Sequence, residues 1–477
     1  MLTTLHFTAL ALLSLYGLHR VWLLVCWHIE HKRPVQAPPF ITGGKDLPLV
    51  TIQLPLYNER FVAARLMDAV ARLDWPKERL EVQVLDDSSD DTRKVVDERA
   101  DYWRSRKINV EVVRRRLRTG YKAGALKNGL MLSTGEYVAI FDADFLPPRD
   151  FLVRAMPYFS DERIGMVQAR WGFLNAGHSW LTCVQSLLLG PHFSIEHRVR
   201  FKRGLFFNFN GTAGIWRTKA IKSSGGWQSD TVTEDLDLSF RAQLAGWRFI
   251  YLDDLVVPSE LPITLAAFRS QQQRWAKGSM QTAKKILPAL LASRLPVSIK
   301  IEAVVTLLAN FCWLLGALIF LTVYPTIMSR IGVGTYHLLR LDLPLILCTS
   351  VAILSYFFIY ALIRKSQASP AHVFLLPILS IGLAPSIALS VLEGIFSRGG
   401  VFERTPKFGI CRRGCLPPSA LIYRQQRFFY ILFNAALFAY SLMPISFAWN
   451  RETWLAIPFL LLFPLGFFTM IVKDLGR

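Results

Sequence analysis

Two aspartates at alternate positions, Asp142 and Asp144, are well suited to hold a cation. They close an apolar run, and in an extended segment the side chains of residues i and i+2 point the same way. Two carboxylates aimed at one point repel each other unless a cation lies between them, and oxygen ligands suit Mg²⁺ or Mn²⁺. Such a cation would also neutralise a diphosphate leaving group. The D-x-D pattern therefore predicts a divalent-metal site for a phosphorylated substrate.

A second acidic pair, Glu234 and Asp235, follows Thr233 further along the chain. Sugar transfer with inversion needs a carboxylate that takes a proton from the attacking hydroxyl. Asp235 is the candidate for this catalytic base, with Glu234 beside it. The same residues also suit the start of a helix, because Thr233 can cap the first turn and the helix dipole favours acids there. One segment can serve both purposes.

Acidic and aromatic residues also follow two earlier apolar runs. Tyr57 and Glu59 come after the first run, and Asp86 and Asp87 end the next one. Acidic groups at strand ends can accept hydrogen bonds from a nucleobase or a ribose. Taken alone, an Asp-Asp-Ser turn is more typical of a helix N-cap, so the donor-binding interpretation depends on the other motifs.

Basic and planar groups supply the counterparts that such a substrate needs. Lys122 lies in a glycine-spaced segment where a loop enters a helix, a position suited to anionic phosphates. On a later amphipathic stretch, Gln271, Arg274 and Trp275 are at positions i, i+3 and i+4, so they share one helix face. Arg and Gln can hydrogen-bond hydroxyls or phosphates, and Trp can stack on a sugar ring. Without the other motifs, this face indicates only an interfacial helix with a Trp anchor.

The elements that must position these residues alternate between strand and helix from Leu49 to about Ile250. Helical patterns such as Phe61–Leu73 and Thr92–Trp103 separate short apolar runs. This alternation predicts an α/β domain with a doubly wound, mostly parallel sheet, whose ligand binds at the carboxyl ends of the strands. The expected strands are Val50–Leu54, Val82–Leu85, Val110–Val113, Tyr137–Phe141 and Met166–Ala169.

The composition places this domain beside a membrane. Apolar residues make up 52% of the 477 residues, and the formal net charge is +20. Because much of the basic excess flanks apolar spans, we expect contact with anionic lipid headgroups and a sugar-nucleotide diphosphate, and no nucleic acid. The first span covers about Leu5–Trp27, and the basic residues after it make its C-terminal end cytoplasmic. Arg20 in this span either snorkels or pairs with a neighbouring helix, or it contacts a product channel.

The C-terminal part returns to the membrane. A basic loop at 397–427 must be cytoplasmic, so an even number of crossings separates it from a cytoplasmic α/β domain. Val373–Phe396, which contains two prolines, is therefore expected to be interfacial or re-entrant, which leaves five full spans. The other C-terminal runs are Val304–Met328, Leu343–Ile363, Phe428–Phe447 and Trp454–Val472. The predicted regions are an N-terminal span (1–34), the α/β domain (35–260), interface helices (261–298) and a C-terminal membrane region (299–477).

Taken in order, these motifs resemble those of the family-2 glycosyltransferases, and more closely the cellulose synthase-like branch, over about residues 48–280. Within that branch the glucomannan, mannan and glucan synthase-like members and their bacterial relatives are the most similar. The resemblance implies a GT-A fold embedded between transmembrane helices, with Mg²⁺ or Mn²⁺ as cofactor. It implies donor-binding roles for Tyr57, Glu59, Asp86, Asp87, Lys122, Asp142, Asp144, Gln271 and Arg274, and acceptor-binding roles for Trp171, Asn210 and Trp275.

One segment of the cytoplasmic loop also resembles that branch. Phe402–Lys407 is similar to the F-x-V-T-x-K gating loop of cellulose synthases, with Arg404 in place of the valine. By this likeness, Thr405 and Lys407 would belong to the donor site and close over the bound nucleotide diphosphate, which excludes water.

The resemblance implies a processive, inverting hexosyltransferase. It would add glucose from UDP-glucose or mannose from GDP-mannose to a growing β-linked polysaccharide, which the membrane spans would hold and help to translocate. A membrane glycolipid synthase, which transfers one sugar to a lipid acceptor, shares these motifs and is the second hypothesis. A transporter without enzymatic activity would leave the strand-end carboxylates unexplained. We expect a multi-pass membrane protein with a cytoplasmic catalytic domain, in a bacterial inner membrane rather than in the Golgi.

Overall fold

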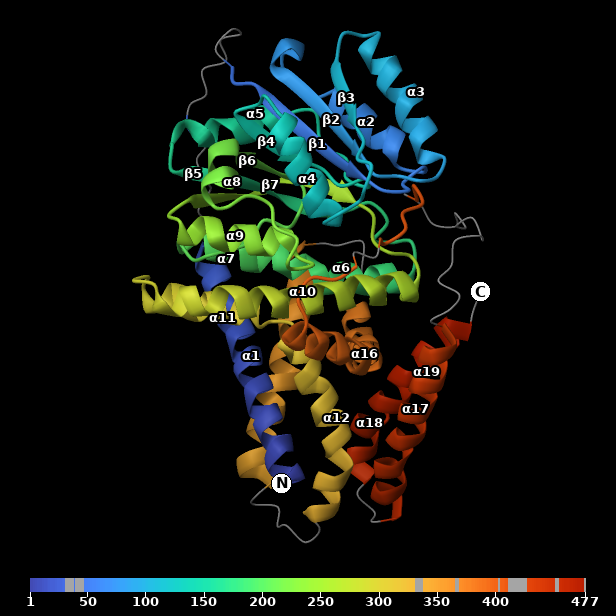
Figure 1. Cartoon of the computed structure of the whole chain (residues 1–477). Coiled ribbons are helices and arrows are strands. Elements are labelled where there is room, and N and C mark those ends of the chain that lie inside the picture. The colour runs from blue at the N-terminus through green and yellow to red at the C-terminus, as the bar shows by residue number, and fades with distance from the viewer. Residues whose placement is uncertain are drawn as a thin grey trace.

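The chain folds into an α/β domain, amphipathic helices beneath it and long apolar helices that run away from it (Figure 1). The computed structural model describes residues 1–30, 38, 47–330, 338–364, 369–401, 404–410, 427–450 and 454–475.

One sheet of seven strands forms the centre of the α/β domain. Its strands are β1 (Val50–Leu56), β2 (Leu80–Asp86), β3 (Asn109–Val113), β4 (Tyr137–Ile140), β5 (Ile164–Phe173), β6 (Gly214–Arg217) and β7 (Arg248–Ser259). Their order across the sheet is β3-β2-β1-β4-β6-β5-β7. β6 is antiparallel to β4 and β5, and the other pairings are parallel. The predicted doubly wound, mostly parallel sheet is therefore confirmed.

Helices cover both faces of this sheet. Alternate residues of the strands supply two apolar cores: Val50 and Ile52 of β1 belong to one, and Val138 and Ile140 of β4 to the other. The helices on the first face are α2 (Ala63–Ala71), α3 (Thr92–Arg104) and α5 (Phe151–Ala155), and those on the second are α4 (Tyr121–Leu132), α8 (Thr218–Ser223) and α9 (Glu234–Leu244).

Two strands, β6 and β7, lie outside the predicted set. β6 has only four residues, too few to show a period of two. β7 carries Asp253 and Asp254 near its middle, which interrupts the apolar alternation. Both strands pair with β5 in the sheet. Their sequences carry the weakest strand pattern, so periodicity alone did not predict them.

Amphipathic helices lie between the sheet and the apolar helices. α10 (Leu265–Ala292) runs across the long axis of the molecule in Figure 1, followed by α11 (Val297–Leu307). α10 begins after Thr264, whose hydroxyl accepts a hydrogen bond from the Ala267 amide at 3.3 Å. α6 (Trp180–Pro191) and α7 (Arg198–Lys202) complete this layer. α10 and the start of α11 lie within the region 261–298 that was expected to form interface helices, and the interfacial role of these helices stays a prediction.

The described part of the chain contains six helices long and apolar enough to cross a membrane. This finding agrees with a multi-pass membrane protein. The segments are Leu2–Glu30 (α1), Phe311–Ser329 (α12), Arg340–Arg364 (including α14, Leu343–Ile346, and α15, Ala352–Arg364), Pro370–Phe396 (including α16, Leu376–Phe396), Phe428–Asn450 (in α17, Arg427–Asn450) and Ile457–Leu475 (α18, Ile457–Leu460, and α19, Leu462–Leu475).

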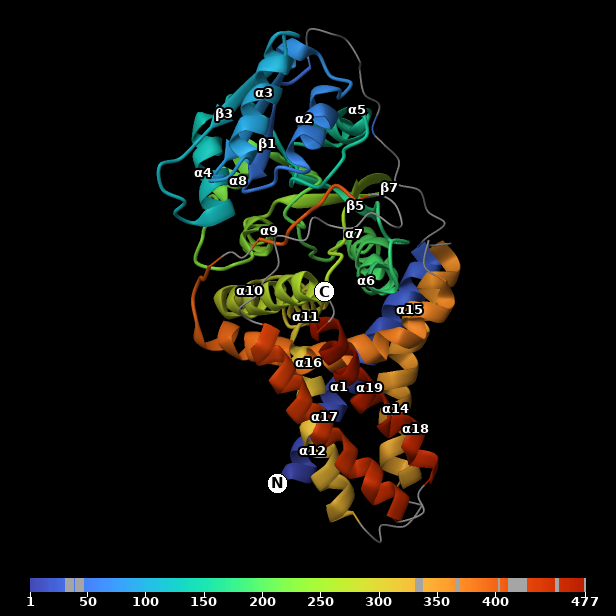
Figure 2. The same ribbon diagram turned by 90° about the vertical axis from the view of Figure 1, so that its right-hand side faces the viewer.

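α16 differs from the other candidates in direction and burial. It lies across the base of the α/β domain, whereas α12 and α17 run away from that domain (Figure 2). Of the residues in the apolar stretch of this segment, 61% are buried inside the structure. In the other five segments this share is at most 33%. Directly after α16, the Gly399 amide donates to the carbonyl of Asp230 in the α/β domain at 2.7 Å. The interfacial placement of this segment stays a prediction, and these contacts favour it.

Candidate active site

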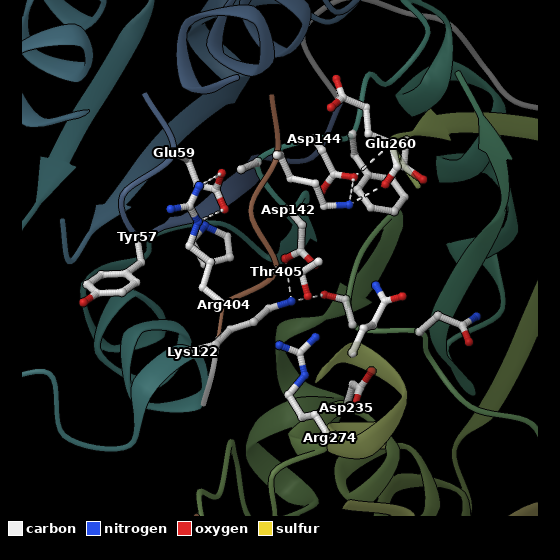
Figure 3. Close-up of a pocket in the computed structure, with 18 of the residues that line it drawn as sticks. Tyr57, Glu59, Lys122, Asp142, Asp144, Asp235, Glu260, Arg274, Arg404 and Thr405 are labelled. Carbon is white, nitrogen blue, oxygen red and sulfur yellow. Dashed lines mark hydrogen bonds and ion pairs between the residues drawn. The ribbon is translucent and has the colours of Figure 1, made fainter. Parts of the chain in front are cut away.

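A cavity of about 170 Å³ lies at the carboxyl ends of β1 and β4, and we call it the donor cavity (Figure 3). Its lining contains every predicted site residue except Asp86. Segments far apart in the sequence therefore converge here: the loops after β1 and β4, the start of α9, the polar face of α10, and the segment after α16. This is the edge of the sheet at which the ligand was expected to bind.

Asp86 was expected to bind the donor, but its side chain does not line the donor cavity. Its side chain is fully buried, and its oxygens accept hydrogen bonds from the Ser88 amide at 3.0 Å and from Arg114 Nε at 2.9 Å. These contacts stabilise the turn after β2. The neighbouring Asp87 lines the donor cavity and pairs with Arg115. The turn interpretation of the Asp-Asp-Ser motif thus describes Asp86, and the site interpretation fits Asp87.

Lysines contact both aspartates of the D-x-D motif. Lys122 Nζ donates to Asp142 Oδ1 at 2.5 Å, and Lys407 Nζ donates to Asp144 Oδ2 at 2.8 Å. Although burial opposes its charge, Asp142 raises the pKa of Lys122. Within the described ranges, no residue donates to Asp142 Oδ2 or to Asp144 Oδ1. Each carboxylate therefore keeps one oxygen for a ligand in the cavity.

In the acidic pair at the start of α9, Glu234 is buried and Asp235 is half-buried, and both lie close to these groups. Burial raises the pKa of Asp235, and burial with the nearby Asp235 charge raises the pKa of Glu234 to about 7. The Leu236 amide donates to Asp235 Oδ1 at 2.8 Å, which fixes the carboxylate at the helix start. A methyl group on Gly211 would lie 2.9 Å from Asp235 Oδ2, so a glycine there leaves the carboxylate its space. A carboxylate with a raised pKa in a cavity is suited to act as a base near neutral pH.

Polar atoms without partners point to a missing ligand. Gln271 Oε1, Thr405 Oγ1 and Trp171 Nε1 are buried and have no hydrogen-bond partner among the described residues. All three side chains line the donor cavity. Buried polar groups in native proteins are almost always hydrogen-bonded, so we expect a polar ligand to satisfy them.

A second cavity of about 480 Å³ lies directly below the first, among the membrane helices. We call it the lower cavity. Trp171, Asn210, Asp235 and Trp275 line both cavities, so the candidate base lies where the two meet. Several further lining residues come from the apolar helices, among them Trp313, Phe320, Phe357 and Phe463.

A buried ionic network borders the lower cavity. Arg20 of α1 pairs with Glu196, which lies in the π-helical turn between α6 and α7. Arg200 contacts Glu196 at 3.2 Å and Glu302 of α11 at 2.7 Å. Arg20, Glu196 and Arg200 also line the cavity. Arg20 therefore pairs with a neighbouring segment and lines the lower cavity, and its contact with a product channel stays a prediction.

One lining residue was missed by the motifs. Glu260 directly follows β7, accepts a hydrogen bond from Arg65 at 2.6 Å and is buried. An acid at a strand end is the signal that located Asp87 and Asp142. Because β7 was not predicted, Glu260 did not stand out.

Comparison with known proteins agrees with this geometry. Residues 48–278 match the family described as glycosyltransferase like family 2. This region, just under half of the chain, is therefore similar to the family-2 glycosyltransferases. The region agrees closely with the predicted 48–280, and it contains the D-x-D motif, the Glu234–Asp235 pair and the polar face of α10.

The relatives are named for mannan synthesis. Glucomannan 4-beta-mannosyltransferase 2 of Arabidopsis thaliana is 46% identical over 257 residues, which cover 53% of this chain and 48% of that enzyme. Glucomannan 4-beta-mannosyltransferase 1 of Oryza sativa subsp. japonica is 41% identical over 330 residues, covering 62% of this chain and 63% of that enzyme. Matches of this kind confirm the cellulose synthase-like branch for the domain, although they span only about half to two thirds of these relatives.

A solved structure supports the fold. The mannosyltransferase PcManGT from Pyrobaculum calidifontis, solved with GDP-Man and Mn²⁺, superposes with a TM-score of 0.55 at 22% identity, covering 82% of this chain and 99% of that chain. At this identity the likeness speaks for the fold alone. The predicted GT-A type of fold is thus confirmed.

Proposed function

We propose that this protein is an inverting hexosyltransferase that extends a β-linked glycan from a nucleotide-sugar, with mannose from GDP-mannose as the favoured donor. The observation that carries the proposal is the place of Asp235 at the junction of the two cavities. A donor in the upper cavity and an acceptor in the lower one would meet at this carboxylate. The names of the plant relatives favour mannose over glucose.

In the proposed reaction, Asp235 takes the proton from an acceptor hydroxyl as that oxygen attacks the anomeric carbon of the donor. The bond from this carbon to the diphosphate breaks, and an α-linked donor gives a β-linked product. Trp275 and Trp171 offer flat faces on which the acceptor sugar can stack. Lys122, Arg274 and Lys407 offset the negative charge of the departing diphosphate.

The D-x-D motif fits a divalent cation. Asp142 and Asp144 line the same cavity, and each has an oxygen that accepts no hydrogen bond from the described residues. Among the same residues, no further His, Cys, Asp or Glu completes a cluster of three ligands. Two carboxylates with the phosphates of a substrate are the usual coordination for Mg²⁺ and Mn²⁺ in such sites. When bound, the cation would stabilise the negative charge on the leaving diphosphate.

A glycan and a lipid acceptor make different demands on the lower cavity. Its walls combine aromatic rings with Asn208, Asn210 and the Arg20–Glu196 pair. Aromatic faces with hydrogen-bonding groups between them suit a sugar chain, whereas a lipid tail needs apolar walls alone. We therefore favour the polysaccharide over the glycolipid, and we propose that the chain leaves through the membrane helices along this cavity.

The membrane placement follows from the same contacts. Residues 404–410 line the donor cavity or contact its walls, so this part of the loop lies on the same side as the α/β domain. We propose five crossings, with α16 in the interface and the α/β domain in the cytoplasm, as the basic loop predicts. The relatives named above come from plants, which gives no support to the expected bacterial inner membrane.

Incubation with radiolabelled donors tests the proposal. Purified protein would receive GDP-mannose or UDP-glucose with Mg²⁺ or Mn²⁺, and the product would be digested with linkage-specific hydrolases. We expect an insoluble product that a β-1,4-mannan hydrolase degrades. Label that enters a single lipid-soluble product would instead establish the glycolipid synthase.

A further inference from the structure

The segment after α16 is attached to the donor cavity by several polar contacts, and we call residues 404–410 the docking segment. Lys407 Nζ donates to Asp144 Oδ2 at 2.8 Å and also to the carbonyl of Glu260. The Gly409 amide donates to Glu260 Oε2 at 3.2 Å. These contacts join the segment to the wall of the donor cavity at Asp144 and Glu260.

The pair formed by Arg404 and Glu59 has the best geometry among these contacts. Arg404 Nε donates to Glu59 Oε1 at 2.9 Å, and Nη2 donates to Oε2 at 3.0 Å (Figure 3). The side chains are only 19% and 10% exposed. A bidentate arginine–carboxylate pair with so little exposure is weakly screened by solvent and is directional. Arg404 engages both oxygens of Glu59.

We propose that Arg404 and Glu59 form a latch that holds the docking segment on the donor cavity and thereby positions Thr405 and Lys407 for the diphosphate. This inference rests on the proposed function. Valine, which the gating-loop pattern of cellulose synthases has at this place, could not form the pair. Glu59 and Arg404 are thus positioning residues, and Glu59 anchors the segment rather than binding the donor.

The latch has an energetic consequence for binding. A segment that is already ordered loses less conformational entropy when the diphosphate binds, so the affinity is higher than for a segment that must first be ordered. Lys407 Nζ lies next to Asp144 and within the lining of the cavity, where its charge can reach the diphosphate. Breaking the latch should therefore weaken diphosphate binding even where the change removes negative charge.

Replacing Glu59 with Gln distinguishes the latch from two alternatives, a purely electrostatic effect and a donor-binding role for Glu59. The variant removes a negative charge beside the cavity, so electrostatics alone would strengthen the binding of an anion. A donor-ligand role would weaken the binding of GDP but leave inorganic pyrophosphate unaffected. The latch predicts that GDP and pyrophosphate both bind about tenfold more weakly to Glu59→Gln, measured with Mn²⁺ on the purified full chain in detergent.

Further variants complete the test. Arg404→Val should weaken the binding of both GDP and pyrophosphate. The double variant Glu59→Gln/Arg404→Val should bind them no more weakly than Arg404→Val alone, because both changes remove the same interaction. The matched control is Arg149→Val, which removes an exposed pair with Asp74 on the same domain and should leave both affinities unchanged. Thermal unfolding of each variant shows whether it is folded, and Arg404→Lys, which keeps the charge but loses the fork, replaces Arg404→Val if that variant is unfolded.

Two results would overturn the latch: unchanged or tighter binding of pyrophosphate to Glu59→Gln, or additive losses in the double variant. A wild-type chain that binds neither GDP nor UDP would instead refute the proposed function. The two failures are therefore distinguishable.

Discussion

The carboxylate of Asp235 lies where the donor cavity and the lower cavity meet, and this placement is the basis of its proposed role. The first turn of α9 fixes its position, and the backbone of Gly211 approaches it closely. Its partial removal from solvent raises the pKa of this half-buried side chain, which favours acceptance of a proton. Few other carboxylates of the described chain combine access to both cavities with such surroundings.

Replacing Asp235 with Asn should abolish transfer while GDP still binds. The amide has the shape of the carboxylate but cannot accept the proton, and loss of a general base costs about 10²- to 10⁴-fold in rate. Turnover of labelled donor and the dissociation constant for GDP would be measured on the same preparation. Normal turnover by this variant would show that Asp235 is not the base.

The pH dependence of the rate should reflect the acidic pair. Asp235, whose pKa burial raises, must lose its proton to act as the base, and the neighbouring Glu234, whose pKa is raised to about 7, gains the charge that disfavours this step as it titrates. We therefore expect kcat/KM to fall as the pH decreases through the region near 7. A rate that stays constant down to pH values of about 5, well below that region, would contradict this expectation.

The same shift acts on stability with the opposite sign. Between the ordinary pKa of 4.5 and about 7, the folded protein binds more protons at Glu234 than the unfolded chain does. The contribution of this group to the free energy of unfolding is therefore greatest below that range and is lost as the pH rises through it. Glu234→Gln should flatten this part of the stability profile, which chemical denaturation at several pH values would measure.

Among the residues, the motifs located those whose chemistry depends on type and spacing. Asp142, Asp144 and Asp235 were predicted because acids at strand ends and helix starts carry a recognisable signal, and all line the donor cavity. Asp86 carries the same signal but faces the turn. Glu260 lacked it because the strand before it could not be recognised. Local pattern cannot tell which of two neighbouring acids points into a cavity, since that depends on tertiary packing.

At the scale of elements, α10 links the membrane side to the catalytic base. Gly278 of α10 lies against Thr233, and a methyl group on this glycine would be 2.4 Å from Thr233 Cγ2. Close packing of this kind lets α10 and the start of α9 approach each other. The strand–helix alternation and the amphipathic face of α10 were predictable from periodicity, whereas this contact was not, because it joins elements far apart in the sequence.

Gly278→Ala should therefore displace the segment that carries Asp235. We expect the free energy of unfolding to fall by about 1–3 kcal/mol, as overpacking usually causes, together with a loss of kcat. The matched stability control is Gly316→Ala, whose new methyl group would meet no atom closer than 3.9 Å. Thermal unfolding and turnover would be compared for both variants. Equal stability of the two would show that α10 can move away at no cost.

At the scale of the whole molecule, hydropathy predicted the apolar segments well but could not decide which of them cross. α16 has the length and composition of a span, yet it lies across the molecule and packs against α10, α12 and α19. The difference arises because hydropathy measures burial in an apolar medium, and a protein interior provides that medium as a bilayer does. Contacts with the α/β domain on the C-terminal side of α16 supply the missing information.

Cysteine labelling from either side of the membrane should separate five crossings from six. With α16 in the interface, Arg398→Cys after α16 should react from the same side as the α/β domain, and Trp454→Cys at the start of α18 from the opposite side. A membrane-impermeant maleimide on sealed vesicles of known orientation provides the measurement. Reaction of Arg398→Cys from the side opposite the α/β domain would mean that α16 crosses.

The most direct test of the central claim is the product that the purified full chain makes from labelled GDP-mannose, with Asp235→Asn as control. A long, β-linked polymer that a β-1,4-mannan hydrolase degrades, formed by the wild-type protein and not by the variant, is the predicted result. Label found only in a lipid-soluble product, or polymer formed equally well by Asp235→Asn, would contradict the account.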